Sequence, residues 1–158
     1  MKSVLSLSQL GRTARRLRRQ GKKVAFTNGC FDLLHVGHLE YLQRLKAKAD
    51  CLIVAVNSDA SVRRLKGAGR PLVPAAERAR MVAALKPVDF VTIFPESTPL
   101  KVIRAIRPDL LAKGADWKRS DVVGGDGVGG RGGRVVLLPF VKGRSTTRLI
   151  RRIQGKGR

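Results

Sequence analysis

The sequence predicts a single Rossmann-like α/β domain, with a doubly wound parallel five-stranded sheet covered by helices on both faces. Short apolar runs that fit strands alternate with amphipathic stretches that fit helices. Residues 51–56 are apolar throughout, as in a strand that is buried on both faces. A length of 158 residues suits one such domain and is too short for two of ordinary size.

Five segments fit the strands of this sheet. Each is short and rich in valine, leucine, isoleucine or phenylalanine, and turn-forming residues such as Asn28-Gly29 follow the first of them. The first two strands, with the helix between them, should form a right-handed βαβ unit. The glycine-rich stretch 114–133 is expected to be a surface loop with a brief helical turn. The expected strands cover residues 24–27, 51–56, 89–94, 110–112 and 134–138.

The segments between the strands fit helices. Leucines at helical spacing mark the helix before the second strand, and Asn57-Ser58-Asp59 offers N-caps for the next one. Pro108 ends a later helix, and Ser145-Thr146-Thr147 caps the closing one. An amphipathic basic helix is expected within residues 1–22, ahead of a domain at 23–154 and a basic tail at 155–158. The remaining helices are expected at about 39–49, 60–65, 74–86, 99–107 and 148–154.

The positive charge is concentrated at the two ends of the chain. The formal net charge is +22, and residues 1–23 carry eight lysines and arginines without an acid, while residues 142–158 carry seven. Such ends could bind nucleic acid through its phosphates. Because no aromatic residues are interleaved with the charges, a solvated basic surface is the better interpretation, and nucleic acid is disfavoured as a partner.

The sequence also indicates where in the cell the protein is expected. No apolar stretch reaches the roughly 20 residues that span a bilayer, and the N-terminus lacks the pattern of a cleavable signal. Two cysteines are too few for a disulfide framework. We therefore expect a cytoplasmic protein without a membrane partner.

The two histidines of the chain, His35 and His38, flank Gly37 after the first strand. At a helix N-terminus this spacing places two imidazole donors beside free backbone N–H groups, and the glycine lets a phosphate approach closely. A pair of hydrogen-bonded polar residues at a turn is the alternative. Zinc binding by both histidines with Cys30 and Cys51 is disfavoured, since the spacing fits no common site and both cysteines are expected to be packed.

The run Gly29-Cys30-Phe31-Asp32-Leu33-Leu34-His35-Val36-Gly37-His38, with Ser145-Thr146-Thr147 before the last helix, resembles the HxGH nucleotidyltransferase superfamily. Within that superfamily the chain is most similar to the nucleotidyltransferase domain of ADP-heptose synthases. The resemblance extends from about residue 5 to residue 154. Its further motifs are Val56-Asn57-Ser58-Asp59, Lys66-Gly67, Gly69-Arg70-Pro71, Glu77-Arg78, Lys113-Gly114-Ala115-Asp116-Trp117 and Gly143-Arg144-Ser145-Thr146-Thr147.

The resemblance implies transfer of AMP from ATP to D-glycero-β-D-manno-heptose 1-phosphate, which gives ADP-heptose, a lipopolysaccharide precursor, and pyrophosphate. Mg²⁺ would accompany ATP, with no protein side chain assigned to the metal. His35, His38 and Lys66 are the candidate catalytic residues, which would bind phosphates and stabilise charge. The candidate nucleotide- and phosphate-binding residues are Asn28, Gly29, Cys30, Phe31, Asp32, Gly37, Asn57, Asp59, Arg70, Arg78, Lys113, Gly114, Asp116, Trp117, Ser145, Thr146 and Thr147.

Structural roles stay open for several of these residues. Lys66 could be a solvated loop lysine, Ser145 a simple helix cap, and Arg78 a surface partner of Glu77. By analogy we expect a homodimer, and a separate kinase that supplies the heptose 1-phosphate. Alternative functions are those of a glycerol-3-phosphate cytidylyltransferase, an adenylyltransferase similar to FAD synthetase, an inactive nucleotide-binding module, or a basic nucleic-acid-binding protein.

Overall fold

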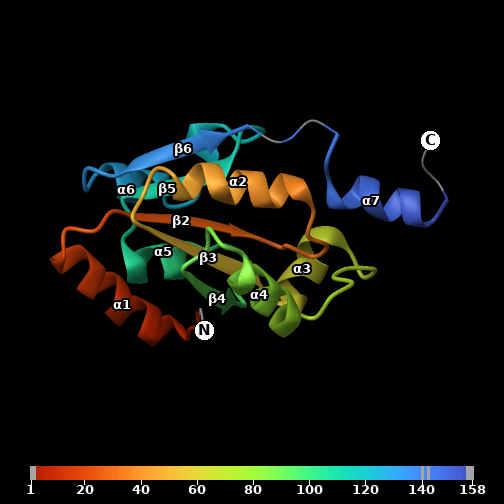
Figure 1. Cartoon of the computed structure of the whole chain (residues 1–158), viewed down its shortest axis with the longest axis horizontal. Coiled ribbons are helices and arrows are strands. Elements are labelled where there is room, and N and C mark those ends of the chain that lie inside the picture. The colour runs from red at the N-terminus through yellow and green to blue at the C-terminus, as the bar shows by residue number, and fades with distance from the viewer. Residues whose placement is uncertain (1–2, 140, 142, 156–158) are drawn as a thin grey trace.

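A computed structural model describes residues 3–139, 141 and 143–155. Its centre is a parallel sheet with the strand order β1-β4-β3-β2-β5-β6 (Figure 1). All five expected strands are present in a Rossmann-like α/β fold, so the predicted fold class is confirmed. The strands are β1 (Ser3–Val4), β2 (Val24–Gly29), β3 (Cys51–Asn57), β4 (Phe90–Phe94), β5 (Leu110–Gly114) and β6 (Arg134–Leu138).

The sixth strand, β1, is an addition that the sequence analysis did not foresee. It pairs with β4 at one edge of the sheet over two residues, a length at which the alternation of apolar and polar residues gives no signal. Within residues 1–22 the helix is therefore α1 (Leu7–Arg19), which begins at the N-cap Ser6. Leu10 and Ala14 of α1 are fully buried against the sheet, whereas its arginines at positions 12, 15, 16, 18 and 19 are exposed.

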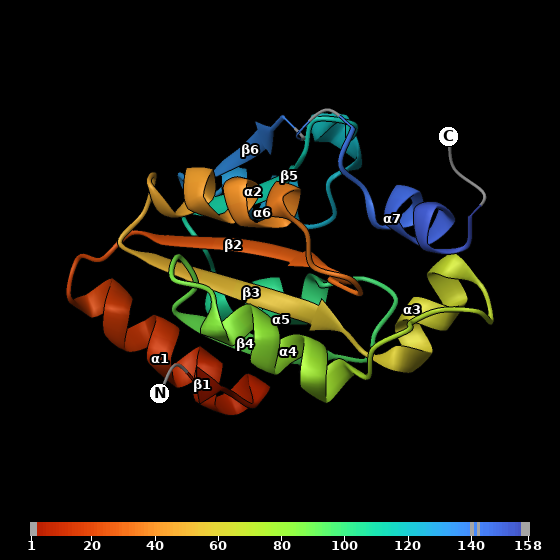
Figure 2. The same ribbon diagram turned by 45° about the vertical axis from the view of Figure 1, so that its right-hand side comes forward.

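Helices cover both faces of the sheet (Figures 1 and 2). The first helix after β2 begins at Val36, directly after His35, so the histidines lie at a helix N-terminus as expected, although the leucine spacing marked the helix only from about residue 39. None of the helices in the described part of the chain is both long and apolar enough to cross a membrane. The helices after α1 are α2 (Val36–Lys46), α3 (Asp59–Lys66), α4 (Ala75–Ala84), α5 (Leu100–Ile106), α6 (Gly125–Gly129) and α7 (Thr146–Ile153), with a 3-10 turn, η1 (Arg119–Asp121).

The stretch 114–133 contains the brief helical turn that was expected, but it is partly buried rather than a surface loop throughout, which corrects that part of the expectation. It contains η1 and α6, and it places Val122 and Val128 in the core with 4% and 0% of their surface exposed. Gly124 adopts a φ of +82° just before α6, a conformation that glycine reaches without strain. The glycines that suggested a loop instead allow a tight turn and a short helix.

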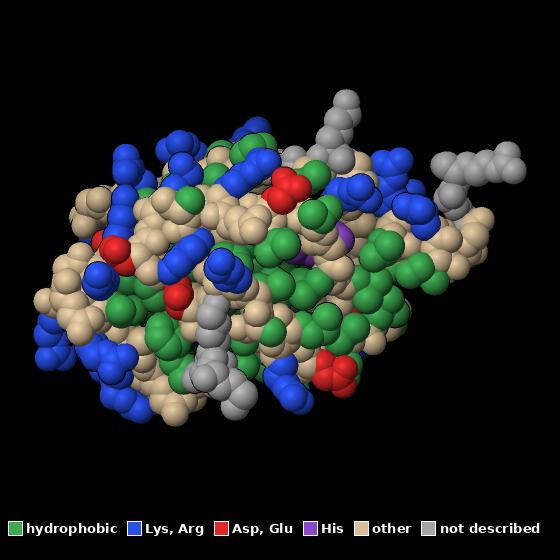
Figure 3. Space-filling model, viewed as in Figure 1, with side chains coloured by type: hydrophobic (Ala, Val, Ile, Leu, Met, Phe, Trp, Pro, Cys, Tyr) green, Lys and Arg blue, Asp and Glu red, His purple; other side chains and the backbone are tan. Residues whose placement is uncertain are grey.

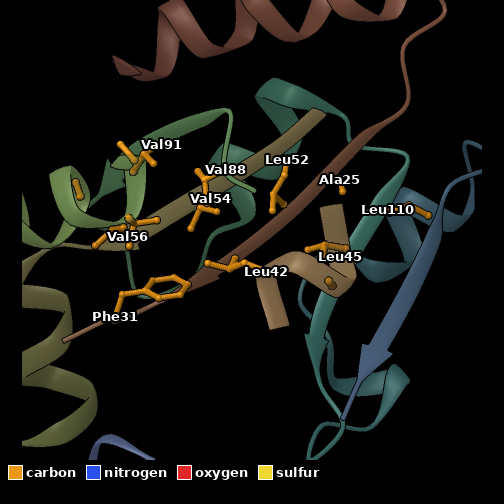
Figure 4. Close-up of a cluster of buried hydrophobic side chains, with 14 of the residues drawn as sticks. Ala25, Phe31, Leu42, Leu45, Leu52, Val54, Val56, Val88, Val91 and Leu110 are labelled. Atoms are coloured by element: carbon orange, nitrogen blue, oxygen red, sulfur yellow. The ribbon is translucent and has the colours of Figure 1, made fainter. Parts of the chain in front are cut away.

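The core consists of two layers, one on each face of the sheet. Side chains of β3 alternate between them: Leu52, Val54 and Val56 point toward α2 and α4, as Figure 4 shows, while Ile53 and Ala55 pack in the layer of α1 and α5. Every residue of β3 is buried. Each fully buried leucine or valine contributes roughly 1.5–3 kcal/mol relative to an exposed position, so these layers hold the strands in register.

The strand order reverses at β2. The chain passes from β2 through β3 to β4 on one side, and then returns to place β5 on the other side of β2. In open α/β sheets, ligands bind beyond the carboxyl ends of the strands at this switch point. The loops that follow β2 and β5 therefore border the predicted binding crevice, and in Figures 1 and 2 α7 lies beyond this end of the sheet.

Candidate active site

The loop between β2 and α2 forms the floor of the candidate site. Gly29 ends β2, and a Cβ atom at this position would lie 3.1 Å from the ring of Phe31. Phe31 is 6% exposed and has a φ of +48°, in the left-handed region that side chains other than glycine rarely occupy. Gly29 therefore makes room for the Phe31 ring beneath the histidines.

The two histidines stack on each other at the start of α2. Their ring centroids are 3.9 Å apart with an angle of 23° between the planes, and the Phe31 ring lies 5.3 Å from that of His38. The backbone N–H of His35 donates to Nδ1 of His38 over 3.4 Å. Since Nδ1 accepts this hydrogen bond, the proton of a neutral His38 is on Nε2, which leaves Nε2 as a donor.

Burial keeps these histidines neutral. It lowers the pKa of His38 to about 4, with the charge of His35 as a smaller cause. Burial also lowers the pKa of His35, and the Arg144 guanidinium lowers it further. Among the described residues, Nδ1 of His35 has no hydrogen-bond partner although it is buried. The helix N-terminus thus offers neutral donors in a positive field, which suits an anion.

The burial of His38 makes the stability of the protein depend on pH. Its pKa is lower in the folded protein than the ordinary 6.5, so the unfolded chain binds the extra proton. The free energy of unfolding should be retained above about pH 6.5 and fall as the pH is lowered from there through the folded pKa of about 4, with a loss of about 2.5 kcal/mol from this residue at pH 4.5. Urea unfolding of the native protein and of H38Q at pH 6.5 and at pH 4.5 measures this change in the free energy of unfolding. Equal pH dependence in the two proteins would contradict it.

Residues at the end of β5 and directly after it lie beside the end of β2 at the switch point. Lys113 Nζ donates to Asn28 Oδ1 over 2.7 Å and lies 5.0 Å from the centre of the Trp117 ring. Burial lowers the pKa of Lys113, and the nearby Asp116 carboxylate partly offsets that effect. Gly114 is buried at the end of β5, whereas Asp116 and Trp117 are exposed. The structure thus brings two predicted residues, Lys113 of β5 and Asn28 of β2, into direct contact.

The segment before α7 lies against the loop that precedes α2. Ser145 caps α7, since its Oγ accepts the N–H of Arg148 over 3.2 Å, and Thr146 Oγ1 donates to the Leu33 carbonyl over 3.4 Å. Ser145 and Thr147 are exposed. In Figure 3, histidine side chains reach the surface, with lysine and arginine side chains beside them on the side toward α7. The threonine segment therefore lies next to the start of α2.

Two of the predicted ligand-binding residues are enclosed in the protein. Asp32 is 2% exposed, and its carboxylate accepts the N–H groups of Leu72 (2.8 Å) and Val73 (3.0 Å) and pairs with Arg70. Arg78 is fully buried. In this structure both hold loops in place rather than face a ligand, and Arg78 is not the surface partner of Glu77.

Other predicted residues lie on the α3 side of the crevice. Asn57 is buried and donates to Ser61 Oγ over 3.0 Å, and Asp59 accepts from Arg78 over 2.7 Å. Lys66 is exposed at the end of α3, and its charge acts on the Cys30 thiol. Burial nevertheless raises the pKa of Cys30, so the thiol stays protonated.

Sequence reasoning missed Tyr41. Its hydroxyl lies 2.9 Å from Thr27 Oγ1, which itself donates to the Ala112 carbonyl over 3.2 Å, so Tyr41 is the donor to Thr27. Burial raises the pKa of Tyr41 to about 12. Tyr41 follows His38 by three residues on α2, a spacing that places both on the same face of the helix, and this spacing could have pointed to Tyr41. The three residues connect α2 to β2 and β5 below the crevice.

No group of three or more histidine, cysteine or acidic side chains in the described ranges is arranged to hold a metal ion. Both thiols have a raised pKa because they are buried, Cys51 to about 12. Since zinc binds the thiolate, these thiols are poor ligands as they stand.

The sequence matches known proteins over most of its length. The model of the cytidylyltransferase-like family matches residues 26–152. The chain is 53% identical over 150 residues to the bifunctional protein HldE of Citrifermentans bemidjiense, covering 95% of this chain and 31% of that protein. It is 56% identical over 136 residues to the bifunctional protein HldE of Syntrophotalea carbinolica, covering 86% and 28%. The chain thus spans about a third of the length of these relatives.

The chain is also similar to solved structures. The lipopolysaccharide core biosynthesis protein of Thermoplasma volcanium has a TM-score of 0.64 and 27% identity, covering 78% of this chain and 100% of that one. A pantoate-beta-alanine ligase from Francisella tularensis, at 14% identity and a TM-score of 0.63, covers 96% of this chain and 77% of that one and shows the fold alone. Because the family model extends from β2 into α7, over most of the chain, the protein belongs to the cytidylyltransferase-like family of HxGH nucleotidyltransferases.

Proposed function

We propose that the protein transfers AMP from ATP to D-glycero-β-D-manno-heptose 1-phosphate. A phosphate oxygen of the sugar would attack the α-phosphorus, forming the new P–O bond as the bond to the β-phosphate breaks, and pyrophosphate would leave with that electron pair. The observation that carries the proposal is the neutral histidine pair at the start of α2 in a chain of this family. The resemblance to ADP-heptose synthases and the identity to HldE proteins support the choice of substrate.

This reaction requires no general base, because the attacking phosphate oxygen is already ionised near pH 7. Catalysis then consists of positioning and charge stabilisation. His35 and His38 would donate to the β- and γ-phosphates together with the N–H groups at the start of α2. Ser145, Thr146 and Thr147 would bind the same triphosphate from the opposite side, and Lys66 would approach it from the end of α3.

ATP would enter with Mg²⁺ as part of the substrate. The described residues contribute no carboxylate cluster for a resident metal, so the triphosphate and water would supply the oxygens that Mg²⁺ prefers. Mg²⁺ would neutralise the charge of the leaving pyrophosphate. We further propose a homodimer in the cytoplasm, where a heptose kinase activity supplies the sugar 1-phosphate.

Lys113 is proposed to bind phosphate at the switch point, and its replacement provides a prediction. K113M keeps most of the apolar stem and removes the charge beside Asn28, so kcat/KM should fall about tenfold or more. The exposed Lys118, in the loop that follows β5, supplies the control K118M, which should behave as the native enzyme. Pyrophosphate release measures both variants, and equal rates for them would remove Lys113 from the site.

The experiment that tests the function is pyrophosphate release with Mg²⁺, using ATP or CTP with heptose 1-phosphate or glycerol 3-phosphate. Release that requires ATP and the heptose supports the proposal. Release with CTP and glycerol phosphate would replace the substrate pair, a second candidate that the description of the family as cytidylyltransferase-like favours. The absence of release with all four pairs would overturn the proposed reaction.

A further inference from the structure

Phe31 is held in a backbone conformation that it would not adopt by itself. Its φ of +48° is unfavourable for an L-residue other than glycine, and such residues persist only where the surrounding contacts fix them. The Phe31 ring also covers one side of His38, at 5.3 Å between the centroids. The contacts that fix Phe31 therefore bear on the position of His38.

Phe31 and its two neighbours, Cys30 and Asp32, are part of a closed ring of hydrogen-bonded residues that Val73 and Arg78 complete. On its N-terminal side, the Cys30 carbonyl accepts from Nη1 of Arg78. On its C-terminal side, Asp32 accepts the N–H of Val73 over 3.0 Å. Val73 closes the ring, because its carbonyl accepts from Nε of Arg78 over 2.7 Å. Both neighbours of Phe31 are thus connected to Val73, Asp32 directly and Cys30 through Arg78.

Arg78 connects three separate segments in this arrangement. Nη2 donates to Asp59 at the start of α3 over 2.7 Å, in addition to the bonds to Cys30 and Val73. The side chain is fully buried, so its charge and its donors are used within the protein. A lysine could not replace it, since one ammonium group cannot reach three acceptors that a planar guanidinium reaches in different directions.

We propose that Arg78 is a positioning residue that holds Phe31 in the left-handed conformation, so that the Phe31 ring keeps His38 covered and stacked on His35. The inference rests on the proposed function, because His38 is the group whose placement serves phosphate binding. The same ring of bonds fixes the loop that carries Arg70 and follows Lys66. Arg78 thereby sets the geometry of the site without touching the substrate.

Histidine titration followed by NMR tests this without any substrate. The chain has two histidines, so two imidazole signals report on the site. In R78K the cover of His38 should loosen, and its pKa should rise from about 4 toward 6.5 by one unit or more. Arg80 is exposed on the same helix, and R80K is the matched control that should leave the titration unchanged. An unshifted His38 in folded R78K would overturn the proposal.

A double-mutant cycle tests whether the effect passes through Phe31. Glycine adopts a positive φ without strain and carries no ring, so F31G alone should expose His38 and raise its pKa. In that background R78K should add little, because the element on which Arg78 acts is gone. Equal shifts from R78K in the native and F31G backgrounds would show that Arg78 does not act through Phe31.

Kinetics and a milder variant complete the test. With the substrate pair that releases pyrophosphate, R78K should lower kcat about tenfold or more while R80K does not. If R78K fails to fold, D59N keeps Arg78 and weakens only its bond to the partly exposed Asp59, and the His38 pKa should then rise by a smaller amount. An unchanged His38 titration in D59N would then count against the proposal. Absence of turnover in the native enzyme would overturn the proposed function, whereas the NMR titration would still decide on Arg78.

Discussion

Replacement of His38 by alanine is expected to lower turnover by about 10²-fold or more, the loss that follows when a preorganised donor to developing charge is removed. The Nε2 donor of His38 is set by the hydrogen bond at Nδ1, by the stacked His35 ring and by the Phe31 ring. A water molecule in the space left by the alanine would not be held in the same direction. The loss should therefore lie mainly in kcat.

The control for H38A is Q43A, because Gln43 is exposed on the same helix and lies away from its N-terminus. Pyrophosphate release under saturating substrate gives kcat, and circular dichroism confirms that both variants are folded. Turnover of H38A close to that of Q43A would contradict the role of the histidines as phosphate donors. The histidine pair would then be a structural feature of the turn, which is the alternative that the sequence left open.

The sequence was sufficient for the parts of the site that depend on local pattern. The buried apolar run at β3 and the turn after β2 predict the βαβ unit, and the position of His35 and His38 directly after it predicts a helix N-terminus. Strand order then brings Lys113 to Asn28, 85 residues away, because parallel strands present their carboxyl ends at one edge. The spacing of the apolar residues and the strand order are therefore enough to predict these parts of the site.

The sequence could not show which charged side chains are buried and bound to partners within the protein. Arg78 and Asp32 have the same side chains as exposed ligands would have, but partners in other segments of the fold bind them, Cys30 and Asp59 for Arg78 and Leu72 for Asp32. Burial of a charge depends on such distant partners rather than on neighbours along the chain. For the same reason the glycine-rich stretch before β6 suggested a surface loop with a brief helical turn, whereas Val122 and Val128 of this stretch pack into the core.

Replacement of Gly37 by alanine is expected to separate activity from stability. A Cβ atom at this position would lie 3.0 Å from Nδ1 and 3.1 Å from Cε1 of His35, and 3.3 Å from Cβ of Arg144. The His35 ring must shift, and the methyl group would occupy the space through which a phosphate reaches the N–H groups of the first turn. We expect kcat/KM to fall by about 10²-fold.

The fold should tolerate the same change, because Gly37 lies in a helix, where alanine is favoured over glycine by roughly 1 kcal/mol. The thermal midpoint of G37A should thus stay close to that of the native protein while activity is lost. Gly129 supplies the matched control, since it is also helical and no atom lies within 4 Å of its added Cβ, so G129A should retain full activity. If G37A kept native kcat/KM, phosphate would not approach the start of α2, and the site would have to be sought nearer Lys113.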